Sequence, residues 1–286
     1  MKIWTVHSAR ALPHVTLLLA ALSLMACTTN PYTGRHQLTM IPASQEMAMG
    51  AQAYQEVLSD PKLPPSHDPR EIEPVKRVAA RIIDAAKKSK YADTANKFDW
   101  EVTVIKDDKT MNAFALPGGK IAVYTGIFPV AKNEAGLAAI LGHEVTHALA
   151  RHGGERMSQG LLAQGGVLVG SLVGANFGID PGITQLAGGA LAQYGVILPY
   201  SRAHESEADH IGLLLAADAG YDPHEAVRVW QRMQEVAKGQ PPEFLSTHPG
   251  HETRIKQLEA WMPEALTHYH PQPGMQASEL PRVAVH

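Results

Sequence analysis

The sequence predicts an α+β fold that is mainly helical, with a small β-sheet beside one central helix. Long stretches place apolar residues at helical spacing, as in Glu73 to Lys90. Only short segments between residues 100 and 124 show the alternation and turn residues that are typical of strands. The chain has 286 residues, of which 45% are hydrophobic. This length and composition suit one large domain with a proper core.

The individual elements follow from these patterns. Helices are expected at Ser44 to Asp60, Glu73 to Lys90, Glu134 to Arg151, Ser201 to Ala217 and Pro223 to Lys238. Strands are expected at Trp100 to Ile105, Ala113 to Leu116 and Ile121 to Tyr124. Because Pro117-Gly118-Gly119 is a turn signal, the last two strands should form a hairpin just before the central helix.

The most informative segment is His143-Glu144-Val145-Thr146-His147, an HExxH pattern on the central predicted helix. Two histidines four residues apart share a helix face and can bind one metal ion. Glu144 points to one side, where it can reach a metal-bound water as a general base. With 15 histidines in the chain, such a pattern also arises by chance. The alternative is therefore a pair of satisfied core histidines.

A catalytic zinc site needs a third protein ligand. The longer pattern with a third histidine requires glycine at position 150 and histidine at position 153, where this chain has Ala150 and Gly153. Glu205, on a later predicted helix, is the candidate, and Asp209 shares its face and could accept the free N–H of either histidine. Glu207 falls on another face, where we expect it to be solvated. The alternative is an ordinary acidic helix start.

Four motifs, in order along the chain, resemble the M48 family of zinc metallopeptidases. They are Asn112 to Gly119, the HExxH helix, Ser201-Arg202 with Glu205 and Asp209, and Ser246-Thr247-His248-Pro249 followed by Arg254-Ile255. The resemblance implies a zincin-type, gluzincin metallopeptidase domain that holds one Zn²⁺ per chain, with Glu205 as the third ligand. The chain looks more like the short periplasmic lipoprotein members, which lack C-terminal helical repeats.

The resemblance also implies roles for residues around the metal. The segment with Asn112, Ala113, Phe114 and Ala115 would be an edge strand that pairs with an extended substrate, and the alternative is an interior hairpin that never meets substrate. A histidine at position 248 can approach the metal in this family, so His248 is a candidate plug or transition-state contact. The alternative is a locally bonded loop histidine. The second oxyanion donor could be any of Tyr200, Arg202, Arg254 and His248.

The amino terminus resembles a bacterial lipoprotein leader. Residues 1–26 carry Lys2 and Arg10 ahead of an apolar stretch too short to span a bilayer. Cys27, the single cysteine of the chain, follows Ala26 and is expected to be lipidated. Because Thr28 is not an aspartate, the resemblance implies an outer-membrane lipoprotein that faces the periplasm. The expected organisation is leader 1–26, lipidated tether 27–42, metallopeptidase domain 43–270 and disordered tail 271–286.

Two further features of the sequence limit the range of possible functions. Removing Lys2 and Arg10 from the 25 basic residues leaves 23 against 28 acidic residues, a net charge of −5, which argues against nucleic acid as a partner. Met157 to Tyr200 is rich in glycine and carries a single charge, Asp180. We interpret it as packed helices or a lid bracketing the site, and membrane contact is the alternative.

The function expected from these observations is zinc-dependent endopeptidase cleavage of unfolded or misassembled envelope proteins. The partners would be those polypeptides, the outer membrane through the lipid anchor, and the outer-membrane protein assembly machinery. A second reading is a chaperone or assembly factor for outer-membrane proteins whose zinc site His248 normally closes. A third, a hydrolase of cell-wall or lipid substrates, has no supporting motif.

Overall fold

A computed structural model describes residues 27–160, 162, 201–238, 243–248, 253–271 and 278–283. Its strands are β1 (Cys27–Thr29), β2 (His36–Leu38), β3 (Glu101–Ile105), β4 (Ala113–Leu116) and β5 (Lys120–Tyr124). Its first helices are α2 (Ala43–Ser59), α3 (Pro69–Ala86), α4 (Ala92–Ala95), η1 (Thr125–Ile127), α5 (Phe128–Ala131) and α6 (Glu134–Leu149). The later helices are α9 (Arg202–Asp218), α10 (His224–Ala237), α11 (Glu243–Thr247) and α12 (Arg254–His268). The predicted α+β, mainly helical fold is confirmed.

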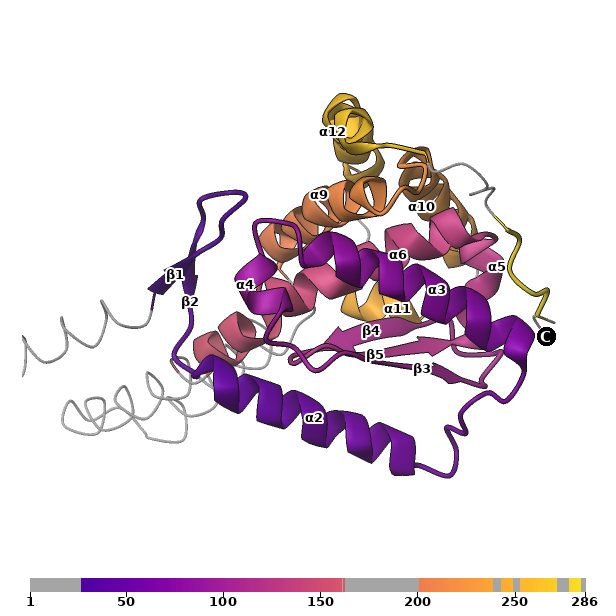
Figure 1. The fold of residues 1–286 in the computed structure, drawn as a ribbon, viewed down its shortest axis with the longest axis horizontal. Coiled ribbons are helices and arrows are strands. Elements are labelled where there is room, and N and C mark those ends of the chain that lie inside the picture. The colour runs from indigo at the N-terminus through magenta and orange to yellow at the C-terminus, as the bar shows by residue number, and fades with distance from the viewer. Residues whose placement is uncertain are drawn as a thin grey trace, which may run out of the picture.

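The molecule is built in layers around a three-stranded sheet with the order β3-β5-β4 (Figure 1). β5 pairs parallel with β3 and antiparallel with β4, so the predicted β4–β5 hairpin is confirmed and β4 lies at the edge. α2 covers one face of this sheet, and α3 and α6 cover the other. α9, α10 and α12 pack on the far side of α6. All five residues of β5 are buried, as expected for the middle strand.

Local signals explain where α3 begins. The carboxylate of Asp68 accepts a hydrogen bond from the N–H of Arg70, and Pro69 takes the first helical position, where its missing N–H costs nothing. The helix therefore starts four residues before the predicted Glu73. The six apolar residues that predicted its inner face are all buried: Val75, Val78, Ala79, Ile82, Ile83 and Ala86.

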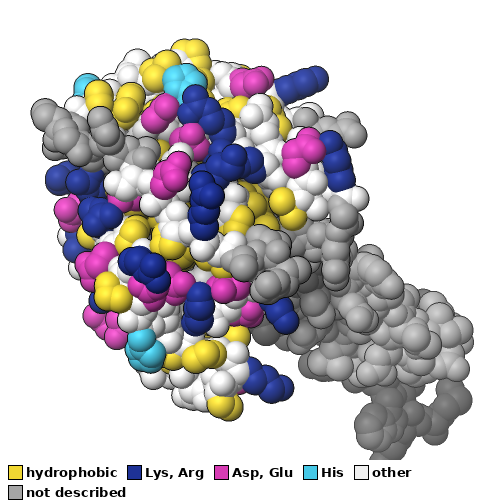
Figure 2. All heavy atoms as spheres, turned by 90° about the vertical axis from the view of Figure 1, so that its right-hand side faces the viewer, with side chains coloured by type: hydrophobic (Ala, Val, Ile, Leu, Met, Phe, Trp, Pro, Cys, Tyr) yellow, Lys and Arg dark blue, Asp and Glu magenta, His cyan; other side chains and the backbone are white. Residues whose placement is uncertain are grey.

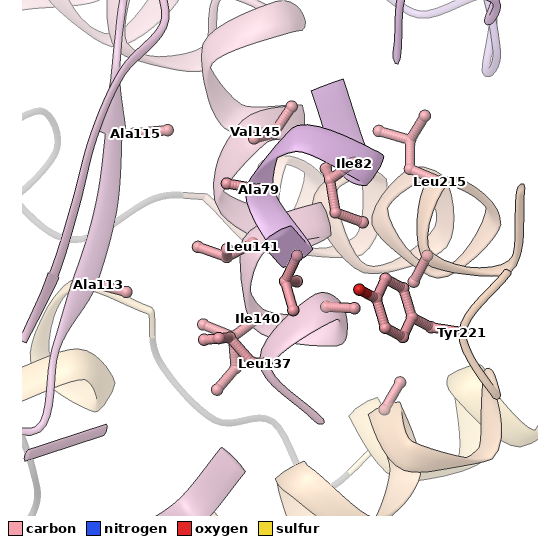
Figure 3. Close-up of a cluster of buried hydrophobic side chains, with 14 of the residues drawn as sticks. Ala79, Ile82, Ala113, Ala115, Leu137, Ile140, Leu141, Val145, Leu215 and Tyr221 are labelled. Carbon is pink, nitrogen blue, oxygen red and sulfur yellow. The ribbon is translucent and has the colours of Figure 1, made fainter. Parts of the chain in front are cut away.

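α6 runs through the middle of the molecule, and its residues from Glu134 to Leu149 are nearly all buried. Asn133 caps its first turn by accepting a hydrogen bond from the N–H of Gly136. Figure 3 shows its apolar side chains meeting those of α3, β4 and α9. The labelled residues from α6 are Leu137, Ile140, Leu141 and Val145. The HExxH segment is thus embedded in the core, which fixes the direction of its side chains.

Two glycines let α6 and α9 approach closely. A Cβ on Gly142 would lie 2.5 Å from the carbonyl oxygen of Gly212, and a Cβ on Gly212 would lie 2.6 Å from the backbone nitrogen of His143. Any side chain at this crossing would push the two helices apart. The crossing therefore brings the HExxH helix and the helix of Glu205 within reach of one metal ion.

Both ends of the described chain differ from expectation. The segment expected to be a polar tether contains a short antiparallel hairpin, in which Cys27 pairs with Leu38 and Thr29 with His36. Part of the expected disordered tail, residues 278–283, packs on α5: the N–H of Leu280 donates to the carbonyl of Lys132, and the Leu280 side chain is buried.

The packed helices or lid expected at Met157 to Tyr200, and membrane contact as the alternative, remain predictions. Among the described helices, none combines the length and the apolar character needed to cross a membrane. Residues 152–160 continue the chain as a helix after α6. The remainder of the glycine-rich stretch to Tyr200, apart from Leu162, lies outside the described residues, as do residues 1–26.

Candidate zinc centre

Four side chains converge at the crossing of α6 and α9. His143, His147, Glu205 and His248 are all buried, and one donor atom of each lies within 4.8 Å of the others. His143 Nε2 lies 3.0 Å from His147 Nε2 and 3.1 Å from His248 Nδ1, and Glu205 Oε1 lies 3.4 Å from His147 Nε2. Two imidazoles and a carboxylate are the donors of catalytic zinc sites, so the set fits zinc.

The protonation states also suit metal binding. Burial lowers the pKa values of His143 and His147 well below the ordinary value, so their ring nitrogens keep lone pairs for a metal. Burial alone would raise the pKa of Glu205, but its contacts with His147 and His248 outweigh it and hold that pKa far below its usual range. The site therefore offers neutral imidazoles and an ionised carboxylate.

Asp209 orients His143, as its spacing from Glu205 predicted. Its Oδ1 lies 2.9 Å from His143 Nδ1, and a carboxylate can only accept, so we assign the His143 proton to Nδ1 and the lone pair to Nε2. Arg254 holds both acidic residues, with NH1 2.7 Å from Glu205 Oε2 and NH2 2.6 Å from Asp209 Oδ1. The guanidinium in turn lies over the Trp230 ring, 3.4 Å from its centroid. Arg254 thus holds the candidate ligand Glu205 and its neighbour Asp209 in place.

Glu144 lies beside the donor set without coordinating it. Its Oε1 lies 3.6 Å from His248 Nε2 and 3.9 Å from His143 Nε2. This atom is buried and has no hydrogen-bond partner within the described part of the chain. An unpartnered buried carboxylate oxygen is costly. Burial raises the pKa of Glu144 to about 7, which is suitable for a group that exchanges a proton near neutral pH.

His147 is oriented by residues that sequence reasoning missed. Its Nδ1 lies 3.0 Å from Nδ1 of His152, whose Nε2 lies 3.1 Å from Glu207 Oε2. Arg35, from the β1–β2 hairpin, donates to Glu207 and to Glu155. The expectation that Glu207 is solvated is wrong, because its side chain is only 6% exposed. The sequence contained a signal that Glu207 is buried, because it lies four and seven residues before Ile211 and Leu214, which are buried on the same helix face.

α11 and His248 lie at one side of the site. The N–H of Phe244, in α11, donates to the carbonyl of Met111, close to the start of β4, at 3.2 Å. The Phe244 ring stacks on the His248 imidazole, with the centroids 4.6 Å apart and the rings inclined by 22°. His248 therefore enters the donor set from a short helix that also contacts the start of the edge strand.

The other predicted residues fall in different places. Arg202 is exposed on the first turn of α9, and Tyr200 lies outside the described residues. Asn112 directly precedes β4, and Ala113, Phe114 and Ala115 belong to this strand, which contacts α6. Cys27 begins β1, and its lipidation stays a prediction.

Comparison with known proteins identifies relatives of this chain. The profile of Peptidase family M48 matches residues 70–262. The mitochondrial metalloendopeptidase OMA1 of Schizosaccharomyces pombe is 37% identical over 240 residues, covering 82% of this chain and 66% of that protein. The human metalloendopeptidase OMA1, mitochondrial, is 33% identical over 83% of this chain and 46% of that protein. The beta-barrel assembly-enhancing protease of Yersinia pestis is 28% identical over 79% of this chain and 45% of that protein.

These relatives correct the expected location. The proteins that match most of this chain at 31–37% identity carry the word mitochondrial in their names, which contradicts the expected outer-membrane lipoprotein facing the periplasm. The location that the lipoprotein resemblance implied was therefore wrong. It rested on a short leader pattern, residues 1–26, which lies outside the described residues. The chain spans about half to two thirds of the length of these relatives.

Proposed function

This chain belongs to peptidase family M48, and from that premise we propose that it is a zinc metalloendopeptidase acting on unfolded or misassembled polypeptides. One observation carries the proposal. The carboxylate of Glu144, whose buried Oε1 has no hydrogen-bond partner among the described residues, lies beside a set of donors that fits one zinc ion. Core histidines satisfied by each other would not require an unpartnered carboxylate next to them.

Each residue of the site has a role in this proposal. His143, His147 and Glu205 hold the zinc, which when bound acidifies water and polarises a carbonyl group. Glu144 accepts the proton of the attacking water and returns it to the leaving amine, which splits the peptide bond. Arg254 is engaged by Glu205 and Asp209, so it positions the ligands. Among the described candidates, His248 lies within the donor cluster and is the one that we assign to a developing oxyanion.

The edge strand supports extended polypeptides as substrates. β4 pairs with β5 along one side only, among the described strands, and it contacts the HExxH helix. Main-chain pairing at a sheet edge selects chains that are extended and unfolded, with little dependence on their side chains. The name of the Yersinia relative refers to β-barrel assembly. We infer that membrane proteins which failed to assemble are the substrate class.

Glu144→Gln tests the catalytic assignment. Because glutamine cannot exchange a proton, casein cleavage by the purified zinc-loaded protein should fall by about 100- to 10,000-fold. The zinc content should stay at one ion per chain, as measured by atomic absorption. Glu134→Gln is a matched control: Glu134 is also buried on α6 but pairs with Arg77 at the opposite end of the helix. Full activity of Glu144→Gln would overturn the assignment.

A second candidate function is favoured by His248. Its Nδ1 lies 3.1 Å from Glu205 Oε1, within the donor set, where it could close the site. The protein would then act as a chaperone or assembly factor that binds unfolded membrane proteins. Zinc bound at one per chain without any casein cleavage would support this function. Complementation of a deletion strain by the Glu144→Gln allele would support it too, and failure of that allele would support the peptidase.

A further inference from the structure

Buried charges connect the N-terminal hairpin to the zinc centre. Arg35 lies between two acidic residues from different helical segments, with NH1 2.7 Å from Glu155 Oε1 and NH2 2.9 Å from Glu207 Oε2. Both carboxylates are almost fully buried, with side chains 4% and 6% exposed. Because buried carboxylates require a partner, the guanidinium fixes their positions as well as neutralising their charge. Thr33, in the same hairpin, also donates its hydroxyl to Glu207.

The carboxylate of Glu207 determines the tautomer of His152. A carboxylate can only accept, so His152 Nε2, 3.1 Å away, carries the proton. With its one proton on Nε2, the neutral His152 ring has a lone pair on Nδ1, which is therefore an acceptor. That Nδ1 lies 3.0 Å from His147 Nδ1, which must then be the donor. The lone pair of His147 is consequently left on Nε2, the atom that faces the other zinc donors.

We propose that Arg35 is a positioning residue of the zinc centre: the β1–β2 hairpin holds Glu207, which through His152 fixes the orientation and tautomer of the ligand His147. The two zinc histidines thus have different supports. His143 is held from within the site by Asp209, which Arg254 binds, whereas the support of His147 extends through His152 and Glu207 to a hairpin that precedes the family match at residues 70–262. Undocking of the hairpin should weaken zinc binding while the helices stay packed.

The test compares Arg35→Gln with Arg151→Gln. Arg151 is a matched control, because it also binds a buried glutamate with two nitrogens, Nε 3.0 Å and NH2 2.7 Å from Glu46. The exposures are close, 21% for Arg151 and 26% for Arg35. The described side-chain partners of Arg151 are Glu46 and the carbonyl of Ile41, neither of which touches a zinc donor. A purely structural role would make the two variants behave alike.

Two readouts separate positioning from stability. The zinc dissociation constant, from competition with a chelator, should rise by about tenfold in Arg35→Gln and stay unchanged in Arg151→Gln. The visible absorption of the Co²⁺-substituted protein, which reports the ligand geometry, should change in Arg35→Gln alone. The melting temperatures of the metal-free variants show whether the two substitutions destabilise the fold to the same extent.

Two results would overturn the proposal: an unchanged zinc affinity and Co²⁺ spectrum in Arg35→Gln, or equal changes in both arginine variants. If Arg35→Gln does not fold, Thr33→Val removes one hydrogen bond to Glu207 and keeps the shape of the side chain. It should then weaken zinc binding in the same direction, and an unchanged affinity would count against the proposal. Zinc binding is measured without substrate, so this result is independent of the proposed peptidase activity.

Discussion

His248 is the fourth member of the donor cluster found among the described residues. Its imidazole stacks on Phe244 and its Nδ1 lies 3.1 Å from both His143 Nε2 and Glu205 Oε1. Burial lowers its pKa, but the carboxylates of Glu144 and Glu205 outweigh this and raise the pKa above the ordinary value. A histidine held in this way competes with water and substrate for the open position of a zinc site.

Replacing His248 with alanine separates its two candidate roles. If His248 closes the site, casein cleavage by His248→Ala should rise, by about tenfold if a tenth of the wild-type molecules are open. If it stabilises the oxyanion, cleavage should fall instead. His210→Ala is the control, because His210 stacks on Trp261 at 4.7 Å and 25° and pairs with Glu264, outside the donor set. Equal rates in wild type and His248→Ala would refute both roles.

Among the described strands, β4 is an edge strand with backbone groups that point away from its neighbour β5. The N–H of Tyr124 donates to the carbonyl of Asn112, which identifies the hydrogen-bonded pairs of the β4–β5 ladder. Since such pairs alternate in an antiparallel ladder, Ala115, opposite Ile121, directs its N–H and C=O away from β5. The N–H of Ala113 is already taken by the Asn112 side chain. Ala115 is therefore the central position for pairing with an extended substrate.

Ala115→Pro tests this pairing. Proline removes an N–H that does not contribute to the ladder with β5, so the sheet should persist while substrate pairing is lost. We expect kcat/KM for an unfolded substrate to fall by about tenfold, the cost of one hydrogen bond of about 1 kcal/mol or more. Zinc affinity should not change. Ala115→Gly keeps the N–H and controls for a weakened strand, and an equal loss in both variants would contradict the pairing.

For the molecule as a whole, stability depends on buried carboxylates paired with arginines. Burial raises the pKa of Glu225, but hydrogen bonds from Arg228 and Arg232 outweigh it and hold the pKa below its ordinary value. Burial likewise raises the pKa of Glu155, but hydrogen bonds with His204 and Arg35 outweigh this effect and lower the pKa. On the face seen in Figure 2, acidic and basic side chains are interspersed, which favours such local pairs.

The pH dependence follows from the direction of these shifts. A carboxylate with a lowered pKa in the folded state contributes stability that is complete above about pH 5 and is lost as the pH falls below the ordinary value near 4.5. Buried histidines and Glu144 also titrate near neutral pH, so the contribution of Glu225 is measured as the difference in urea stability between metal-free wild type and Glu225→Gln. This difference should be about 1–3 kcal/mol from pH 7 to 5 and smaller at pH 3. Exposed Glu259→Gln, the control, should cost nothing, and a difference for Glu225→Gln that does not depend on pH would contradict the argument.

The sequence predicted what depends on local spacing. Helical periodicity located α3, α6 and α9, and the HExxH pattern together with the later Glu205 identified three of the four donors. The support of His147 could not be predicted. Arg35 lies 172 residues from Glu207, and no local pattern pairs an arginine with a particular distant glutamate. The same holds for α11, whose Phe244 N–H donates to the carbonyl of Met111 near the start of β4.

The residues of the zinc centre are far apart in the sequence. This separation determines when the centre can form during synthesis. His143 and His248 are 105 residues apart, Arg254 contacts His143 across 111, and Arg35 reaches across 172 to Glu207. Contacts of such separation form only after the intervening chain has been made and has collapsed. A nascent chain that still lacks α12 therefore has no Arg254 to hold Glu205 and Asp209 in place. The complete zinc centre is assembled only when folding of the chain is nearly finished.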